Sequence, residues 1–268
     1  MLNGMWAPVV QSWQWRHFIV SSIRNDLKVR FSRSVLGGLW MLLNPLAMVL
    51  MYTVILSAVL SAKLPGIDNR FAYAIYLISG MLGWTLFLEI VQRCISVFIE
   101  HANQIKKINF PKITLPIIVT GTSLIGYLTL LIVTLIAFAC LSHLYWQGWL
   151  WIPVLTVITT FLAVGFGLIL GVINVFVRDL GQLMNIVLQL LFWFTPIVYP
   201  AHIVPESLQY LQKLNPLYHI VESYHQVLAY NQAPSIGALS AIFALSCLLL
   251  WMAMRVYRKA SSEMMDVL

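Results

Sequence analysis

Residues that could perform covalent or metal chemistry are few in this chain, and none of them falls in a catalytic motif. No Gly-x-x-x-x-Gly-Lys-Ser/Thr segment is present, so the chain lacks the phosphate-binding loop used by ATPases. His219 and His225 are six residues apart, which does not place them on one helix face, and there is no His-Glu-x-x-His. No Ser, Cys or Lys lies in a recognisable nucleophile motif. The sequence therefore predicts no catalytic site and no metal site.

One pair of ionisable residues lies inside an apolar segment. Glu89 precedes Arg93 by one helical turn, a spacing that allows an ion pair. A charge in hydrocarbon costs about 2.5–3.5 kcal/mol on insertion scales, so such a residue usually has a function. A structural pair near the cytoplasmic face is the simpler interpretation and the one we prefer. Proton- or sodium-driven carriers usually need more carboxylates than this at the membrane midplane.

The most unusual stretch of the chain lies between Lys112 and Arg178, where 65 consecutive residues contain no Asp, Glu, Lys or Arg. A membrane-spanning helix needs about 20 apolar residues, so this run accommodates two spans and a turn. The expected turn is Gln147-Gly148, set among the interfacial aromatic residues Tyr145, Trp146, Trp149 and Trp151. The chain is 60% hydrophobic and 9% charged, against about 25% charged in soluble domains. We therefore expect an integral membrane protein.

Six spans can be placed in a single domain of residues 1–268. They are Leu36–Ser61, Phe71–Val91, Ile113–Leu144, Trp149–Val177, Leu180–Tyr199 and Ile236–Met254. Of the 16 Lys and Arg residues, 13 then fall on one side, which the positive-inside rule makes cytoplasmic. The expected fold class is all-α and integral to the membrane, with six transmembrane helices and both termini cytoplasmic. The six-span core covers 36–254, and a cytoplasmic tail follows at 255–268.

Three segments outside the spans have helical patterns. Residues 11–33 form an amphipathic helix in the cytoplasmic interface, with an apolar stripe at Trp15, Phe18, Ile19, Ile23, Leu27 and Phe31. A simple membrane anchor and a docking element fit this helix equally well. Residues 103–112 form a short basic helix ended by Pro111, which composition alone favours as an ordinary positive-inside loop. On the outer side, Pro205–Lys213 and Pro216–Tyr230 are expected as two helices, the second capped by Asn215.

Small residues in the apolar segments are expected to bring helices close together. Gly167 and Gly171 have the small-xxx-small spacing of such contacts, and Gly165 lies beside them. Cys94, Cys140 and Cys247 are odd in number and set in apolar runs. We interpret the cysteines as small buried hydrophobic residues and not as a disulfide framework or a metal cluster.

A series of short motifs runs in order from about residue 24 to residue 220. They are Arg24-Asn25-Asp26-Leu27-Lys28-Val29-Arg30-Phe31, Leu36-Gly37-Gly38-Leu39-Trp40, Asn44-Pro45, Ala102-Asn103, Ile105-Lys106-Lys107, Phe110-Pro111-Lys112, Leu115-Pro116, Asn174-Val175-Phe176-Val177-Arg178-Asp179-Leu180, Phe194-Thr195-Pro196-Ile197-Val198-Tyr199-Pro200, Ile203-Val204-Pro205-Glu206 and Leu214-Asn215-Pro216-Leu217. Each motif is weak alone. Together they resemble the permease subunits of bacterial polysaccharide exporters of the ATP-binding-cassette (ABC) class, which carry O-antigen, capsule or teichoic acid chains.

The resemblance implies a multi-pass permease of the bacterial inner membrane and not an enzyme. It would act as a homodimer with two copies of a separate ABC ATPase subunit, and ATP and Mg would be bound by that partner, with no cofactor on this chain. The 11–33 helix would be the interface helix, and the helices after Pro205 would be outer gate helices. The 103–112 segment would be the coupling helix that docks on the ATPase. This replaces the ordinary positive-inside loop that composition alone favours. Its coupling residues would be Asn103, Ile105, Lys106, Lys107, Phe110 and Pro111.

The substrate implied by the resemblance is a long glycan linked to undecaprenyl diphosphate. Aromatic rings suit the C–H faces of sugars, and the expected channel aromatics are Tyr52, Trp84, Phe87, Trp193, Phe194 and Tyr199. The cations expected at the diphosphate or at lipid headgroups are Arg24, Lys28, Arg30 and Arg33. A permease for a small drug or lipid is one alternative function. A secondary carrier or channel that needs no ATPase is the other.

Overall fold

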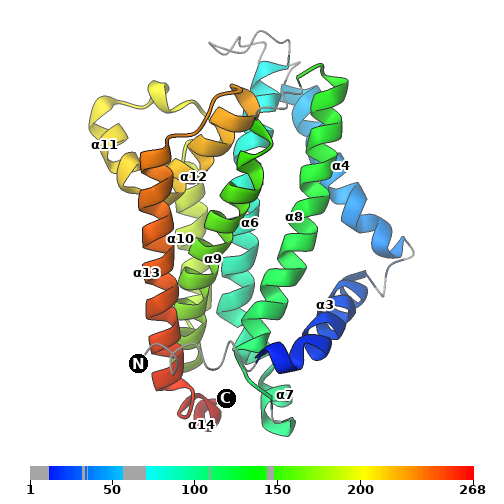
Figure 1. The fold of residues 1–268 in the computed structure, drawn as a ribbon, viewed down its shortest axis with the longest axis vertical. Helices are drawn as coiled ribbons and strands as arrows, with labels where there is room; N and C mark the ends of the chain where they lie inside the picture. The colour runs from blue at the N-terminus through cyan, green and yellow to red at the C-terminus, as the bar shows by residue number, and fades with distance from the viewer. Residues whose placement is uncertain (1–11, 32–33, 35, 57–70, 109, 144–147) are drawn as a thin grey trace.

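Long apolar helices that run side by side make up the described part of the chain (Figure 1). The structure is a computed structural model, and it describes residues 12–31, 34, 36–56, 71–108, 110–143 and 148–268. No β-strand occurs within these ranges. The all-α membrane fold expected from the sequence is therefore confirmed.

Among the described residues, five helices are long and apolar enough to cross a bilayer. The first is the Gly37–Val54 segment, which includes α4 (Trp40–Met51) and runs into a π-turn at Tyr52–Leu56. The others are α6 (Ala72–Glu100), α8 (Thr114–Cys140), α9 (Trp151–Phe176) and α13 (Ile236–Ala260). α6 continues to Glu100, beyond the predicted end at Val91. As a consequence, both Glu89 and Arg93 lie inside one continuous helix.

The sixth predicted span is shorter than expected. α10 (Leu180–Phe194) is an apolar helix of 15 residues, below the about 20 residues that a full span needs. It ends where Thr195 precedes Pro196, because helical backbone angles are disfavoured for a residue before proline. Thr195 is extended, with ψ 131°. The predicted span to Tyr199 is therefore wrong at its outer end, where the chain turns at Thr195.

α6 is the centre of the bundle, and small residues let α9 and α13 pack closely. A Cβ added to Gly171 would collide with the backbone oxygen of Cys94, and one added to Gly167 would lie 2.8 Å from the Cβ of Cys94. Gly165 faces Leu249 of α13 in the same way. The glycine contacts expected from the sequence are confirmed. Cys94 is buried as expected, but Cys140 and Cys247 are exposed on this chain, so that part of the prediction is wrong.

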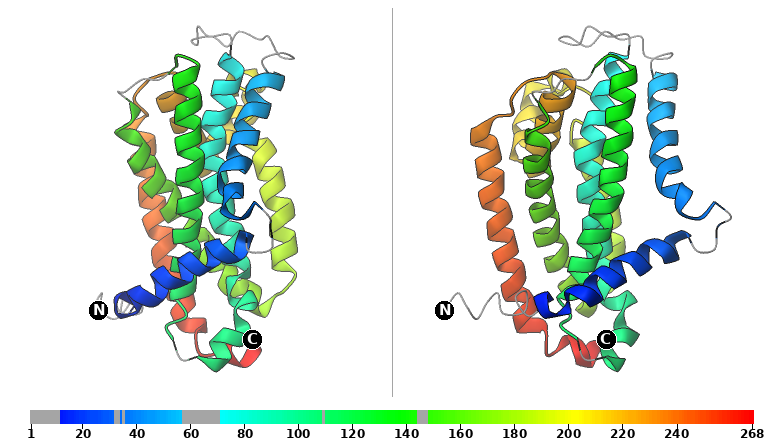
Figure 2. Two further views of the ribbon diagram at one scale, coloured as in Figure 1. Left: turned by 90° about the vertical axis from the view of Figure 1, so that its right-hand side faces the viewer. Right: turned by 45° about the vertical axis from the view of Figure 1, so that its right-hand side comes forward.

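The two ends of the bundle carry different short helices. One end holds α3 (Arg16–Phe31), α7 (Ala102–Lys107) and α14 (Met264–Val267), and α3 lies across the bundle instead of along it (Figures 1 and 2). The other end holds α11 (Glu206–Leu214) and α12 (Pro216–Tyr224). Lys106, Lys107 and Arg258 lie on elements of the first end and Lys213 on an element of the second. This arrangement fits a cytoplasmic end marked by α3 and α7.

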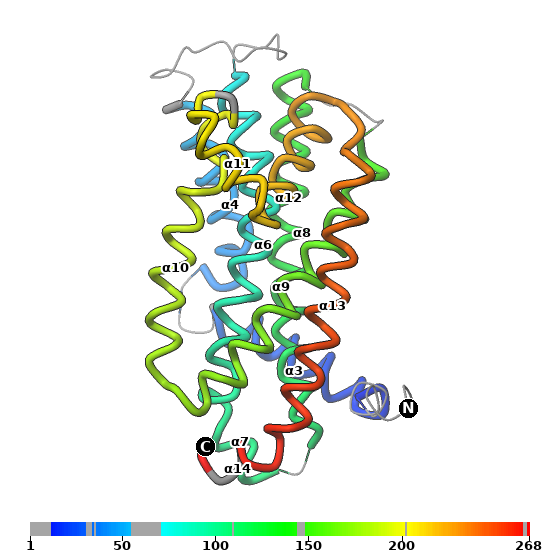
Figure 3. Tube along the Cα trace, turned by 90° about the vertical axis from the view of Figure 1, so that its left-hand side faces the viewer, coloured from blue at the N-terminus to red at the C-terminus, as the bar shows by residue number. Residues whose placement is uncertain are grey.

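The outer helices fold back against the bundle (Figure 3). Asn215 caps α12 as predicted, because its side-chain oxygen accepts the Leu217 N–H at 3.0 Å. Leu217 and Val221 are buried by α6 and its neighbours, and the helix continues as a π-turn over His225–Ala229. Leu208 and Leu211 are exposed on α11. α11 thus lies on the surface of this chain, with an apolar face open to lipid or to a second protein.

Candidate functional site

Two ion pairs join the transverse helix α3 to the central helix α6. Arg30 donates to Glu89 at 2.7 Å and Arg93 donates to Asp26 at 2.5 Å. The predicted pair of Arg93 with Glu89 is present at 3.9 Å, but it is the longest of the three contacts. Each of the four side chains is about a quarter to a third exposed. Glu89 and Arg93 therefore serve as the α6 half of a four-residue network that holds α3.

Asp26 is the member of this network that the sequence analysis missed. The signal was available as a repeated spacing: an acid precedes a base by four residues in Asp26…Arg30 and again in Glu89…Arg93. Residues four apart share a helix face, so each helix presents one acid and one base to the other. The two pairs can then form crosswise, and the net charge of the contact is zero.

A polar cavity of about 240 Å³ lies beside the network, where α3, α6, α7 and α8 meet. Its polar lining comes from Ser22, Asn25 and Asp26 on α3, from Arg93 on α6, from His101 between α6 and α7, and from Gln104 on α7. Nη1 of Arg93 is buried there with no hydrogen-bond partner in the described structure. The cavity therefore has hydrogen-bonding capacity at the end of the bundle that carries α3 and α7.

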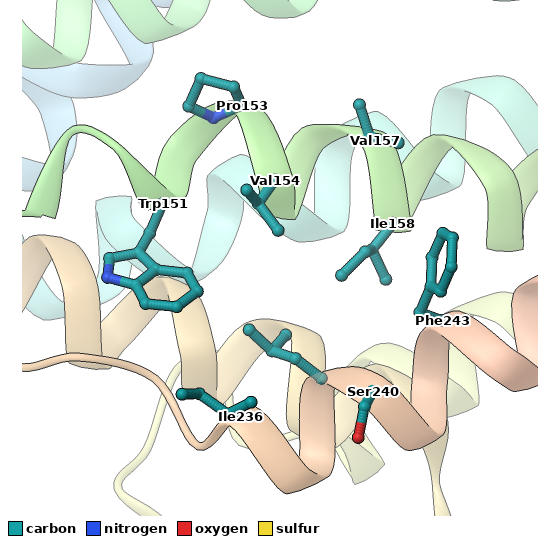
Figure 4. A pocket seen from close by; sticks show the side chains of 9 residues that line it. Trp151, Pro153, Val154, Val157, Ile158, Ile236, Ser240 and Phe243 are labelled. Atoms are coloured by element: carbon teal, nitrogen blue, oxygen red, sulfur yellow. The ribbon is translucent and has the colours of Figure 1, made fainter.

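The larger cavities are apolar and open to the sides of the bundle. One of about 510 Å³ lies between α9 and α13 near the outer end, where Trp151, Ile158 and Phe243 face one another (Figure 4). The hydroxyl of Ser240 beside it is already bonded to the carbonyl of Gly237 at 2.9 Å. A second of about 510 Å³ involves Ile23 of α3 and the inner half of α8. Neither holds convergent polar groups, and both suit lipid acyl chains.

The short helix α7 packs against the bundle through apolar side chains, while its lysine side chains are exposed. Ile105 and Phe110 are buried, and the Phe110 ring lies 5.5 Å from the ring of Phe18 on α3. Asn103, Lys106 and Lys107 are exposed. Pro111 is half-buried, and its carbonyl accepts the Thr114 N–H at 2.9 Å, which starts α8. Five of the six predicted coupling residues therefore lie together, with the polar side chains exposed and the apolar ones buried. Pro111, the sixth, joins this segment to the long helix α8.

The predicted channel aromatics separate into two groups. Trp84 and Phe87 are each 3% exposed, and their rings pack against Phe192 at 5.5 Å and Phe166 at 6.3 Å. Trp193 is 59% exposed and Phe194 is 36% exposed, at the outer end of α10. The remaining two, Tyr52 and Tyr199, are half-buried, and the Tyr199 hydroxyl donates to the Trp193 carbonyl at 2.7 Å. Open ring faces are therefore offered mainly by the α10 pair.

The predicted diphosphate cations are also not equivalent. Arg24 and Lys28 are exposed on α3. Arg30 is committed to Glu89, and Arg33 lies outside the described residues. The two free cations are one helical turn apart, so they lie on the same face of α3.

The described helices form a bundle of long apolar segments crossed at one end by α3, which is the architecture of a multi-pass membrane protein (Figure 1). The family model for the ABC-2 type transporter membrane component matches residues 17–229. Because that match covers most of the chain, the protein belongs to the ABC-2 type transporter family. Permeases of this family lack ATPase activity and pair with an ABC ATPase, and the bacterial relatives are proteins of the inner membrane.

Similar proteins carry names connected with glycan export. The chain is 29% identical over 209 residues, 76% of its length and 77% of the relative's, to the O-antigen export system permease protein RfbA of Klebsiella pneumoniae. It is 28% identical over 259 residues, 95% of its length and 96% of the relative's, to the RfbA protein of Myxococcus xanthus. It is 25% identical over 200 residues, 74% of its length and 75% of the relative's, to the polysialic acid transport protein KpsM of Escherichia coli.

Proposed function

We propose that this permease exports a polysaccharide linked to a lipid diphosphate, such as an O-antigen-like glycan, across the inner membrane. The observation that carries the proposal is the alignment with an O-antigen export permease over nearly the whole of both chains. Relatives named for O-antigen and for polysialic acid share long polymers as cargo and differ in the sugar. A long polymer needs a continuous path and no single deep pocket, and the two cavities of about 510 Å³ described above are lined almost entirely by apolar side chains.

The energy for export is supplied by the partner ATPase in this proposal, and α7 is the coupling helix. Two permease chains and two ATPase chains form the transporter, with ATP and Mg on the ATPase. Lys106 and Lys107 point away from a base made by buried Ile105 and Phe110. A rigid base lets a push on the exposed face reach α6 and α8 directly, and cations suit an acidic cleft on a partner.

The route of the substrate follows from the exposed groups. Arg24 and Lys28 bind the diphosphate at the cytoplasmic face, while α3 acts as the interface helix. Exposed aromatic rings at Trp193 and Phe194 support the sugar chain near the outer end. The helices α11 and α12 act as gate helices over that end. The boundaries of this organisation are 11–33 for the interface helix, 36–254 for the permease core and 255–268 for the tail.

Reconstitution with the partner ATPase tests the proposal. The full permease and the ATPase encoded beside it, placed together in vesicles, are expected to move a lipid-diphosphate-linked glycan only when ATP and Mg are present. Transport of a small drug or a phospholipid, with no movement of glycan, would assign the alternative ABC function. Glycan movement that ignores ATP but follows an ion gradient would assign a secondary carrier.

A further inference from the structure

The side-chain carboxamides on the apolar helices are unevenly distributed. Those exposed on this chain lie on α4, α6 and α10 and are Asn44, Gln92, Gln182, Asn185 and Gln189. α8 and α13 contain no Asn or Gln. α9 contains one, Asn174, which is 4% exposed and bonded at both ends, to the Ile95 carbonyl and to the Gly181 N–H, each at 2.9 Å. The exposed carboxamides therefore mark particular helices and are not scattered over the bundle.

Those helices share one edge of the molecule. α4 and α10 lie at one edge of the bundle beside α6, and α13 lies at the opposite edge (Figures 2 and 3). Gln92 of α6 donates to Asn185 of α10 at 3.2 Å, which ties the two helices together there. We call Asn44, Gln92, Gln182, Asn185 and Gln189 the carboxamide edge.

On α10 the carboxamides form a stripe along the helix. At 3.6 residues per turn, Gln182, Asn185 and Gln189 fall within about 60° of one another, and Trp193 continues the same line. The stripe from Gln182 to Trp193 is about 16 Å long at 1.5 Å per residue. The same helix carries no Asp, Glu, Lys or Arg. An apolar helix thus presents a row of neutral hydrogen-bonding groups that ends in an open aromatic ring.

Such a row is unfavourable against lipid, because hydrocarbon offers no hydrogen-bond partners. Polar side chains in membrane segments face a bundle interior or a water-filled path. A carboxamide donates two hydrogen bonds and accepts two, so it can bond a sugar hydroxyl in either direction. This makes the row suitable for a chain of hydroxyl groups that slides past in many registers.

We propose that the carboxamide edge lines the export path and binds the hydroxyl groups of an uncharged glycan. This inference rests on the proposed export function and adds the class of cargo. An acidic polymer in the same path requires cations along it, since carboxylates and phosphates are bound chiefly by Arg and Lys. On the described part of this edge the ionised groups of α6 are Glu89, Arg93 and Glu100, and the first two are paired with α3. Arg178 and Asp179, which directly precede α10, are exposed and carry opposite charges. The path therefore favours neutral sugars over acidic ones.

Export measurements in vesicles that hold the permease and its ATPase test the inference. Gln182→Met and Gln189→Met remove the hydrogen bonds and keep a flexible side chain of similar length, while Asn185 is left to hold Gln92. Each hydrogen bond lost is expected to lower the rate of export of a neutral glycan about two- to tenfold. Leu190→Met is the matched control, because it adds the same side chain one position away and removes no amide. The control is expected to export at the wild-type rate.

A charge at the same position tests the class of cargo. Gln189→Lys is expected to raise the rate for an acidic glycan relative to a neutral one on the same lipid carrier, and Gln189→Glu to lower it. Unchanged export by both Met variants, or a neutral-to-acidic ratio that Gln189→Lys does not alter, overturns the inference. Dissociation of the two permease chains by Gln189→Met also overturns it, because the amides would then bind the second copy. If wild-type vesicles move no glycan at all, the export function itself fails.

Discussion

Arg93 illustrates how a single residue can link two helices whose sequences are far apart. Its guanidinium donates to Asp26 of α3 and approaches Glu89 on its own helix, while Glu89 is held by Arg30. A lone Glu89–Arg93 pair would stabilise only α6. The crossed arrangement instead fixes the position of α3 against the centre of the bundle. Because the side chains are partly exposed, each pair contributes about 1 kcal/mol or less.

The network predicts a specific pattern of rescue. Arg93→Asp is expected to loosen α3 and lower export, because it places a third acid beside Asp26 and Glu89. Adding Asp26→Arg restores one crossed pair with the charges exchanged, and export should recover in part. Cross-linking between α3 and α6 measures the docking separately from transport. If the double variant is no better than Arg93→Asp alone, the pairing does not position α3.

Gly80 offers a second prediction at the scale of one residue. A Cβ at Gly80 would collide with Nε2 of His225, whose ring is fully buried and stacked on Tyr76 with centroids 3.7 Å apart. Gly80→Ala is expected to cost about 1–3 kcal/mol by overpacking and to lower the unfolding temperature in detergent. Gly237→Ala near the start of α13 is the control, since a Cβ there meets nothing within 4 Å. Equal unfolding temperatures for the two variants would contradict this account of the packing.

His225 also predicts how stability changes with pH. Burial lowers the pKa of His225, and this outweighs the opposite effect of the Glu222 carboxylate, which lies 4.0 Å from Nδ1. The unfolded chain, with a histidine pKa of about 6.5, then binds more protons than the folded one below that pH. Stability contributed by neutral His225 is complete above about pH 6.5 and is lost as the pH falls toward the folded pKa. His225→Phe, which keeps an aromatic ring on Tyr76, is expected to show a flatter decline of unfolding temperature between pH 7 and pH 5.

At the scale of elements, α7 is the part whose form best matches a role in transmission. It has only six residues, yet its apolar side is buried under α3, and Pro111 leads directly into α8. Ile105 on α7 and Phe110 just before α8 are both buried, so the segment is packed against the bundle at two points. The same arrangement keeps Lys106 and Lys107 available to a partner.

Charge reversal tests this role of α7. Lys106→Glu together with Lys107→Glu is expected to reduce ATP-driven export sharply and to weaken binding of the ATPase, because the docking cations become anions. Insertion and helical content should persist, since both side chains are exposed. Lys213→Glu on α11, at the opposite end of the bundle, is the control for the charge change and is expected to leave binding of the ATPase unchanged. If the double variant exports at the wild-type rate, α7 does not transmit ATPase motion and serves only to fix the topology of the loop.

The elements also show which parts of the fold a sequence can specify. The apolar runs, the Asn215 cap and the glycine contacts were predictable, because hydropathy, capping and small-residue spacing are local properties. The early end of α10 at Thr195 was visible in principle, since Pro196 disfavours helical backbone angles at the residue before it. The burial of Trp84 and the exposure of Leu211 were not predictable, because each depends on which helix packs opposite. The crossed ion pairs required two distant segments to be compared.

At the scale of the whole molecule, a single chain does not enclose the residues that we propose to line the export path. In the first span, Gly37–Val54, only about 6% of the residues are buried within the chain. Most residues of α10 are exposed as well. Both lie at the edge that carries the exposed carboxamides, whereas α6 is buried on nearly every side. A second copy placed against that edge would enclose the exposed groups, which is the arrangement proposed for the transporter.

Cysteine labelling then distinguishes the path from the packed core. In a background with Cys94→Ala, Cys140→Ala and Cys247→Ala, single cysteines replace Trp84, Phe87, Trp193 and Phe194 in turn. Alanine suits position 94 because Gly167 and Gly171 leave no room for a larger side chain. With the ATPase bound and no nucleotide, positions 193 and 194 are expected to react with a water-soluble thiol reagent. Positions 84 and 87 should stay inert, since their rings are enclosed by Phe192 and Phe166. Reaction at 84 or 87 only after ATP is added would mean that the core opens during export, whereas inert cysteines at 193 and 194 in every state would place the outer end of α10 against lipid or protein and exclude it from the path.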